Sequence, residues 1–289
     1  GNEYHKMPFY GWLSLFSTGL AIVWFVVLLQ FRSEISKIQK IISAFVILCV
    51  AEALFWQYHY QKWNSAGSRS HVVLLTASLL SSLKWASAFV FALVVSLGWS
   101  VTRPYLDRQL MLKIQAMWFF YVVFGFIQTL EPAYRTDFSF SSIITTIFLS
   151  PAVALPAGIC YWMFKSLSVL LGTLEERQQQ EKLVLFQRFW GLMIASIATS
   201  FIFVLCQCIE LMTRQPGHQT WKYEWLLSDA TSNAAFLLGL GVVMRLWAPG
   251  KGSQDLVYHR ASQNTDAKQV GASTVDDVFD ESLDDALPR

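Results

Sequence analysis

Long apolar stretches alternate with short polar segments along almost the whole chain, and seven of these stretches are candidates for membrane spans. An α-helix needs about 20 apolar residues to cross the hydrocarbon of a bilayer. The pattern therefore predicts an all-α membrane protein with a seven-transmembrane helix bundle. The fifth stretch contains Pro151 and Pro156, which remove backbone donors and predict either a kink or the start of a helix. The predicted spans are 9–31, 38–58, 72–99, 110–130, one within 140–171, 189–212 and 225–247.

The composition agrees with this pattern. Charged residues make up 15% of the sequence and hydrophobic residues 54%, whereas a soluble domain usually carries about 25% charged residues. The net charge is +2 and the basic residues lie at span ends, so we expect no nucleic-acid partner. The cysteines all lie within apolar stretches and predict no disulfide framework; they are Cys49, Cys160, Cys206 and Cys208.

Lys and Arg are more frequent in the segments that follow the first, third, fifth and seventh spans than on the other side. Because cytosolic loops carry an excess of Lys and Arg, this bias predicts a lumenal or extracellular N-terminus and a cytosolic C-terminus. The residues on the richer side are Arg32, Lys37, Lys40, Arg103, Arg108, Lys113, Lys165, Arg177, Lys182, Arg188, Arg245 and Lys251.

Three domains are expected. The chain begins with Gly1 close to the first span, so we expect residues 1–8 to be the lumenal remnant of a missing N-terminal domain. Residues 9–249 form the bundle. Residues 250–289 have too little apolar surface to fold alone and predict a disordered, acidic cytosolic tail. Phe279 and Leu283 stand among its acidic residues, so a sorting or coat-binding contact is the alternative interpretation.

Ionisable residues inside the spans provide the candidate site. Glu52, Lys84 and Asp229 lie within the second, third and seventh spans, and each falls in the half nearer the lumen in the predicted orientation. Such residues are costly in lipid and usually face the bundle interior. Helical spacing places Trp56 and His59 beside Glu52, and Ser232 and Asn233 beside Asp229. We therefore predict a polar cavity for a ligand or ion, lined by Glu52, Trp56, His59, Lys84, Asp229, Ser232 and Asn233.

Several interpretations of these charges remain open. Lys84 could pair with Glu52 or Asp229 in a buried network that stabilises the packing of the helices. The same groups could hold a ligand or lipid headgroup, or form an ion or proton pathway. The histidines lie at span ends without an H-x-x-x-H pair, and the sequence has no phosphate-binding loop or nucleophile elbow. We therefore expect no enzymatic activity, no metal site and no cofactor.

Five short motifs lie within the predicted spans or at their ends: MPFYG (7–11), IQK (38–40), LLSSLK (79–84), VSLGWSVTRPYL (95–106) and LWAP (246–249). In combination they resemble the motifs of the GOST proteins, also called the lung seven-transmembrane receptor family, and the resemblance covers residues 7–250. Thr102, Arg103 and Pro104 stand where a G-protein-coupled receptor has D-R-Y, so we do not expect a G protein as partner.

The resemblance implies a function as well as a fold. It implies a Golgi membrane protein that cycles through endosomes or the plasma membrane and acts in vesicle trafficking, including endosome-to-Golgi retrieval. It also implies a lumen-facing cavity that can hold a membrane lipid, with Glu52, Lys84 and Asp229 matching the family's cavity positions. The expected partners are a phospholipid and trafficking cargo or sorting machinery. The alternatives are a cation channel, transporter or channel regulator, and an orphan receptor.

Overall fold

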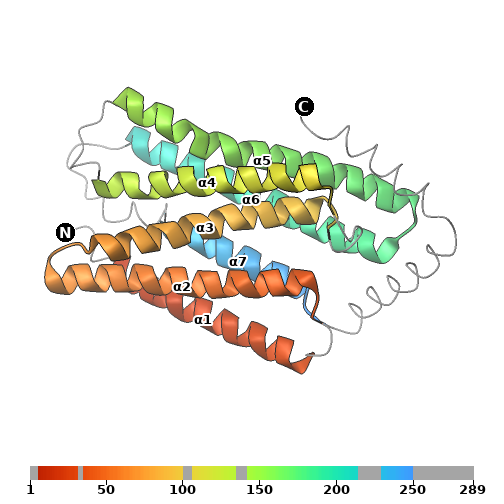
Figure 1. Cartoon of the computed structure of the whole chain (residues 1–289), viewed down its shortest axis with the longest axis horizontal. Helices are drawn as coiled ribbons and strands as arrows, with labels where there is room; N and C mark the ends of the chain where they lie inside the picture. Colours follow the sequence, from red (N-terminus) through yellow and green to blue (C-terminus); the bar gives the residue numbers. More distant parts are fainter. Residues whose placement is uncertain (1–5, 32–34, 100–105, 135–141, 214–228, 250–289) are drawn as a thin grey trace. The chain divides into compact units, whose positions relative to one another are not determined.

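The computed structural model describes residues 6–31, 35–99, 106–134, 142–213 and 229–249. All regular secondary structure in these ranges is helical (Figure 1). Lipid offers no hydrogen bonds to the backbone, and helices satisfy every peptide group internally. The helices are α1 (Lys6–Gln30), α2 (Lys37–Ala66), α3 (His71–Ser96), α4 (Arg108–Tyr134), α5 (Ser142–Glu176), α6 (Gln180–Thr213) and α7 (Thr231–Leu246).

The predicted fold class is confirmed. Helices α1 to α6 each contain a stretch long and apolar enough to cross a membrane, and α7 is a shorter apolar helix of 16 residues. The seventh predicted span, 225–247, begins outside the described residues, and a π-type turn at Asp229–Ala230 leads into α7. Pro151 and Pro156 lie inside α5 rather than at its start. The predicted N-terminal remnant and acidic tail lie largely or wholly outside the described residues.

Tight turns end three of the helices. Gly67 and Gly98 follow α2 and α3 with φ angles of 65° and 78°, a conformation that glycine adopts without a Cβ clash. Gln178, with φ 53°, separates α5 from α6. There the amide of Gln179 donates to the carbonyl of Leu174 at 3.1 Å, which closes the end of α5. These helices extend the predicted fifth and sixth spans into the charged segment 173–186, as expected from its helix-forming residues.

The chain forms two compact units, which are described separately. Unit 1 comprises α1, α2 from Gln39, the start of α3 to Ala77, α6 from Gln187, and α7. Within it α1 packs against α7, and Trp24, which is 2% exposed, donates from Nε1 to Ser43 Oγ of α2 at 3.0 Å. Unit 1 therefore joins the first two predicted spans to the last.

Unit 2 comprises α3 from Ser78, α4, α5 and the start of α6 to Phe186. Here α4 packs against α5, and Trp118 Nε1 on α4 donates to Ser87 Oγ on α3 at 3.0 Å. A Cβ added at Gly125 would lie 3.7 Å from the side chain of Ser82, so small residues allow α3 and α4 to approach closely.

Candidate ligand-binding site

The inward face of α2 is the core of the candidate site in unit 1. Glu52, Trp56 and His59 are 3%, 9% and 3% exposed, so all three are buried as predicted. Residues spaced by three or four positions share one face of a helix, and Cys49, one turn before Glu52, is buried on the same face. Leu54 and Tyr58 on other faces of α2 are exposed, which is appropriate for lipid contact.

An aromatic cluster surrounds His59. Tyr10 of α1 stacks on Trp56 and Tyr60 of α2 with ring centroids 5.8 and 5.2 Å apart, and Trp56 meets the His59 ring edge-on at 5.7 Å. Offset-stacked and edge-on arrangements are the favoured geometries of aromatic rings. Trp63 lies 5.9 Å from His59, and the guanidinium of Arg69 lies 4.1 Å from the centre of the Trp63 ring. The cluster extends from the start of α1 to the end of α2.

His59 has an unsatisfied hydrogen-bonding group. Its Nδ1 is buried and has no hydrogen-bond partner among the described residues. A buried polar atom without a partner costs about 1–3 kcal/mol. A ligand or ion that supplied the missing interaction would remove this cost. His59 is therefore a group in unit 1 whose hydrogen bonding a ligand could complete.

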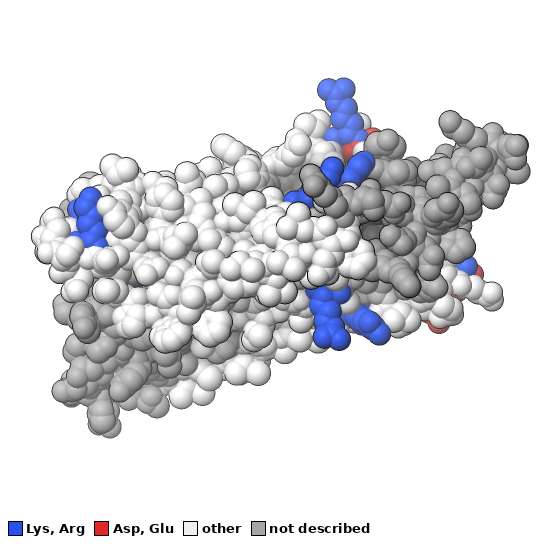
Figure 2. All heavy atoms as spheres, turned by 90° about the horizontal axis from the view of Figure 1, so that it is seen from below, with Lys and Arg blue, Asp and Glu red and all other residues white. Residues whose placement is uncertain are grey.

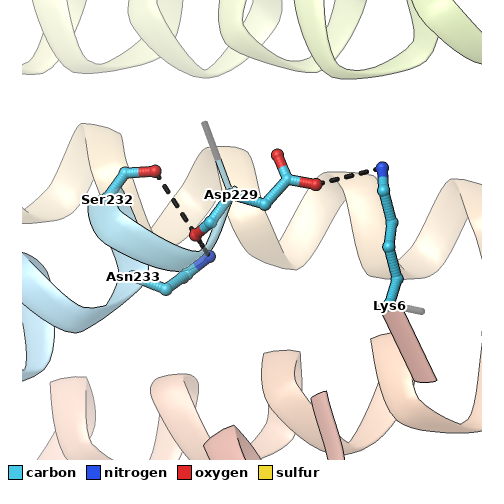
Figure 3. A network of polar contacts seen from close by, with 4 residues as sticks. All are labelled: Lys6, Asp229, Ser232 and Asn233. Carbon is cyan, nitrogen blue, oxygen red and sulfur yellow. Dashed lines mark hydrogen bonds and ion pairs between the residues drawn. The ribbon is translucent and has the colours of Figure 1, made fainter. Parts of the chain in front are cut away.

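An ion pair links the start of α1 to the start of α7. Lys6 Nζ lies 3.1 Å from Asp229 Oδ2, with the two side chains 23% and 34% exposed (Figure 3). The main-chain carbonyl of Asp229 accepts hydrogen bonds from Asn233 Nδ2 at 2.9 Å and from Ser232 Oγ at 3.4 Å. The predicted stripe on the seventh span is therefore a set of contacts around the first turn of the helix.

Lys6 is a site residue that was not predicted from the sequence. Lys84 was a candidate partner of Glu52 or Asp229, whereas the described ion pair of Asp229 is formed with Lys6. The signal was present, because the predicted orientation places Lys6 and Asp229 on the same side of the membrane. Lys6 was missed because it lies just outside the first predicted span, where a charge costs little in lipid.

Lys84 is buried in unit 2, where it is 2% exposed. Its Nζ lies 5.3 Å from the centre of the Trp85 ring, within the range of a cation–π contact. The small residues Ser78, Ser82 and Ala86 on the same helix are also buried. The candidate residues thus fall into two groups, with Lys84 in unit 2 and the others in unit 1.

Unit 2 also contains buried polar groups that were not predicted from the sequence. Ser78 Oγ on α3, and Trp162 Nε1 and Ser166 Oγ on α5, are buried without a hydrogen-bond partner among the described residues. Trp162 and Ser166 are one turn apart and share a face of α5. The sequence offered no signal for them, because a serine or tryptophan in an apolar span is commonplace until its surroundings are known.

The described polar groups of unit 1 are able to bind a polar or charged ligand. Within the described ranges, no group of three or more His, Cys, Asp or Glu side chains is placed to hold a metal ion. Glu52 can accept hydrogen bonds or attract a cation, and the ring of His59 can donate or accept one. Unit 1 thus offers a carboxylate and an imidazole on one aromatic-lined helix face.

Comparison with known proteins agrees with the fold. The helices and their apolar lengths define a multi-pass membrane protein with a seven-helix bundle. Residues 5–254 match the family described as "GOST, seven transmembrane domain", and the chain belongs to this family.

Similar sequences come from animals and yeast. Transmembrane protein 87A of Xenopus tropicalis is 27% identical over 259 residues, which cover 89% of this chain and 46% of the relative. Membrane protein PTM1 of Saccharomyces cerevisiae (strain YJM789) is 26% identical over 302 residues, covering 99% of this chain and 55% of the relative. Human transmembrane protein 87A is 23% identical over 280 residues, covering 96% and 49%. The chain therefore spans about half the length of these curated relatives.

Proposed function

We propose that the protein acts in membrane trafficking in the Golgi and endosomal system, as a non-enzymatic seven-helix protein that binds a lipid or cargo group. Membership of the GOST family supports this proposal. In the proposed orientation, the N-terminus is lumenal and the C-terminus is cytosolic. Lys6, Asp229 and the aromatic cluster around His59 would then lie toward the lumen, and the segment between α5 and α6 would face cytosolic sorting machinery.

The observation that carries lipid or cargo binding is the buried polar face of α2. Glu52 and His59 are both 3% exposed within a helix that is long and apolar enough to span a membrane. An ionisable residue makes the insertion of a span into the membrane more costly. Such residues are therefore usually functional. The unsatisfied Nδ1 of His59 adds a group that a bound headgroup or cargo side chain could satisfy.

Native mass spectrometry of the purified protein, combined with lipid analysis, tests this binding. We expect a defined lipid to co-purify with the wild type and to be lost from Glu52→Gln. Leu54→Ala is the matched control, because Leu54 lies on the same helix but is 49% exposed. Lys84→Ala asks whether the buried lysine of unit 2 is also required. If the wild type retains no lipid, lipid binding is wrong. If every variant retains the same lipid, Glu52 and Lys84 are structural and the polar face of α2 is not its binding site.

Localisation is tested separately. The full-length protein should co-localise with Golgi markers, and loss of the protein should slow the return of endosomal cargo to the Golgi. Deletion of the acidic residues 276–285 should disperse it if this segment contacts sorting machinery. Golgi localisation that survives the deletion would show that the tail is not the sorting contact.

A cation channel is the second candidate, and the buried carboxylate of Glu52 is the observation that favours it. A carboxylate in a membrane-spanning helix can mark an ion pathway. Cation flux into liposomes containing the purified protein distinguishes the candidates. A flux that is reduced by Glu52→Gln and Asp229→Asn supports a channel, whereas the absence of flux in a lipid-binding preparation supports the trafficking proposal.

A further inference from the structure

The end of unit 1 opposite Asp229 also has cations, but the contacts beside them are buried and uncharged. Gln39 at the start of α2 donates from Nε2 to the main-chain carbonyl of Trp247 at 3.1 Å, and Phe189 of α6 packs edge-on against the Trp247 ring at 5.6 Å. Gln39, Phe189 and Trp247 are 3%, 2% and 8% exposed. These contacts bring together the start of α2, the first part of α6 and the end of α7. We call this region the Trp247 end.

Three cations lie next to the residues of this buried contact in the sequence. Lys40 follows Gln39, Arg188 precedes Phe189, and Arg245 lies two residues before Trp247; all three are exposed. None of them forms an ion pair within the described residues. Because each lies within two residues of a buried contact, the packing of the three helices holds their main-chain positions together. We call Lys40, Arg188 and Arg245 the basic cluster.

The described part of unit 1 has no acidic residue near the basic cluster. In the described part of this unit the acidic residues are Glu52, Glu210 and Asp229. Asp229 precedes α7, whereas Arg245 lies in its last turn. Glu210 is near the far end of α6, 22 residues beyond Arg188, which corresponds to about 33 Å along a helix. Glu52 lies more than three turns into α2 from Lys40, about 18 Å along the axis. Among the described residues of this unit, the basic cluster therefore has no nearby counter-charge.

The position of the cluster along the helices indicates what could supply the counter-charge. Arg188 immediately precedes the apolar part of α6 although the helix begins earlier, at Gln180, and Arg245 ends the apolar part of α7. A broad uncharged surface separates groups of Lys and Arg on the face shown in Figure 2, as expected where apolar helices meet lipid. Lys40 lies in the first turn of α2. All three cations thus lie near an end of apolar helix surface, where lipid headgroups are expected.

We propose that the basic cluster is a binding site for the headgroup of an anionic phospholipid that carries more than one negative charge. Arg binds phosphate oxygens with two parallel N–H donors, and Lys adds a point charge. Three cations on three helix ends could surround a headgroup with a phosphodiester and a further phosphate. Gln39, Phe189 and Trp247 would act as positioning residues. This inference is independent of the proposed function, because it uses neither the polar face of α2 nor the buried carboxylate.

Lipid competition in nanodiscs tests the site. The full chain is placed in phosphatidylcholine nanodiscs containing a small fraction of phosphatidylinositol monophosphate, and native mass spectrometry measures the lipids that remain bound. Each Lys or Arg near an anionic surface changes the affinity roughly fivefold at low ionic strength. We expect the triple variant Lys40→Gln, Arg188→Gln, Arg245→Gln to retain this lipid on the order of 100-fold less than the wild type. Raising the salt concentration should reduce the difference.

A charge-matched control separates the basic cluster from a general loss of positive charge. Arg108→Gln, Lys113→Gln, Arg177→Gln removes three exposed cations from unit 2 and should leave binding within a factor of a few of the wild type. The conservative variant Arg188→Lys, Arg245→Lys should retain most of the binding, which also shows that the positions tolerate substitution. Equal losses in the two triple variants, or no loss in the first, would overturn the proposal.

An acidic peptide is the other possible counter-charge, and a deletion distinguishes it. The segment 276–285 contains six acidic residues: Asp276, Asp277, Asp280, Glu281, Asp284 and Asp285. If the wild type binds the lipid with this segment present, a lipid is the ligand of the basic cluster in the intact protein. If binding is seen only after residues 276–285 are removed, the basic cluster serves an acidic peptide and the lipid proposal is wrong.

Discussion

The two ends of unit 1 differ in how their charged side chains are paired. At the Asp229 end, Lys6 and Asp229 form an ion pair beside the aromatic cluster of Tyr10, Trp56 and Tyr60. At the Trp247 end, the contacts are a neutral hydrogen bond and an aromatic pair, and the cations around them are exposed without described acidic partners. The first end therefore contains an ion pair, whereas the cations of the second have no described acidic partner within the unit.

This contrast indicates where each end derives its stability. Stacked rings and a buried polar bond depend on the surrounding packing, and their loss leaves a cavity or an unpaired group. Removal of an exposed cation changes the stability of the bundle little, because water and lipid already solvate the charge. We therefore expect substitutions at buried residues of either end to destabilise the bundle, and substitutions in the basic cluster to change lipid binding alone.

Removal of the central ring of the aromatic cluster should have the largest effect on stability. Trp56→Ala deletes a ring that is 9% exposed and stacks on both Tyr10 and Tyr60. Truncation of a buried aromatic residue costs about 3–5 kcal/mol. Thermal unfolding in detergent should show a clear decrease in Tm. The control is Trp12→Ala on α1, where the ring is 62% exposed. Equal decreases for the two variants would show that the cluster is not a packed core.

Loss of the buried hydrogen bond at the Trp247 end should have an intermediate effect. Gln39→Leu removes the donor to the carbonyl of Trp247 and leaves that carbonyl without this bond in a buried position. The expected cost is about 1–3 kcal/mol, measured by denaturant unfolding in micelles. Gln61→Leu, at an exposed position of the same helix, should change stability little. An unchanged unfolding midpoint for Gln39→Leu would mean that the three helix ends are held together without this bond.

The ion pair at the Asp229 end should contribute less. Its side chains are 23% and 34% exposed, so solvent screens the attraction. A double-mutant cycle of Lys6→Gln and Asp229→Asn should give a coupling free energy of about 0.2–1 kcal/mol, decreasing as salt is added. The single variants in 1 M salt serve as the control for charge screening. A coupling well above this range, insensitive to salt, would show that the pair is more deeply enclosed than its exposure indicates.

Neutralisation of the basic cluster should have the smallest effect on stability. Lys40→Gln, Arg188→Gln and Arg245→Gln each change an exposed side chain and should shift the free energy of unfolding by no more than about 0.5 kcal/mol. The unfolding transition of each variant in uncharged detergent measures this. Destabilisation comparable to that of Gln39→Leu would mean that the cations support packing, and the contrast between the two ends would disappear.

The sequence predicted the inward face of α2 correctly. Glu52, Trp56 and His59 recur at helical spacing, and a span must turn such residues away from lipid, so their burial followed from the sequence pattern. The same reasoning placed Lys84 in a buried position. Which residue pairs with Asp229 was not predictable, because several lysines satisfied the same requirement and only the packing of α1 against α7 selects Lys6.

The sequence by itself determined that this is a seven-helix membrane protein of the GOST family and that α2 has a polar inward face. The reason is that lipid permits few backbone structures and few positions for charge, so pattern and composition are sufficient. Only the tertiary structure decided that Lys6 pairs with Asp229, that Tyr10 stacks on Tyr60 in the aromatic cluster, and that Gln39 donates to the carbonyl of Trp247. Gln39 and Trp247 are 208 residues apart in the chain. Helical periodicity determines which face of a helix a residue occupies, but the side chains that fill the space between helices determine which helix that face meets.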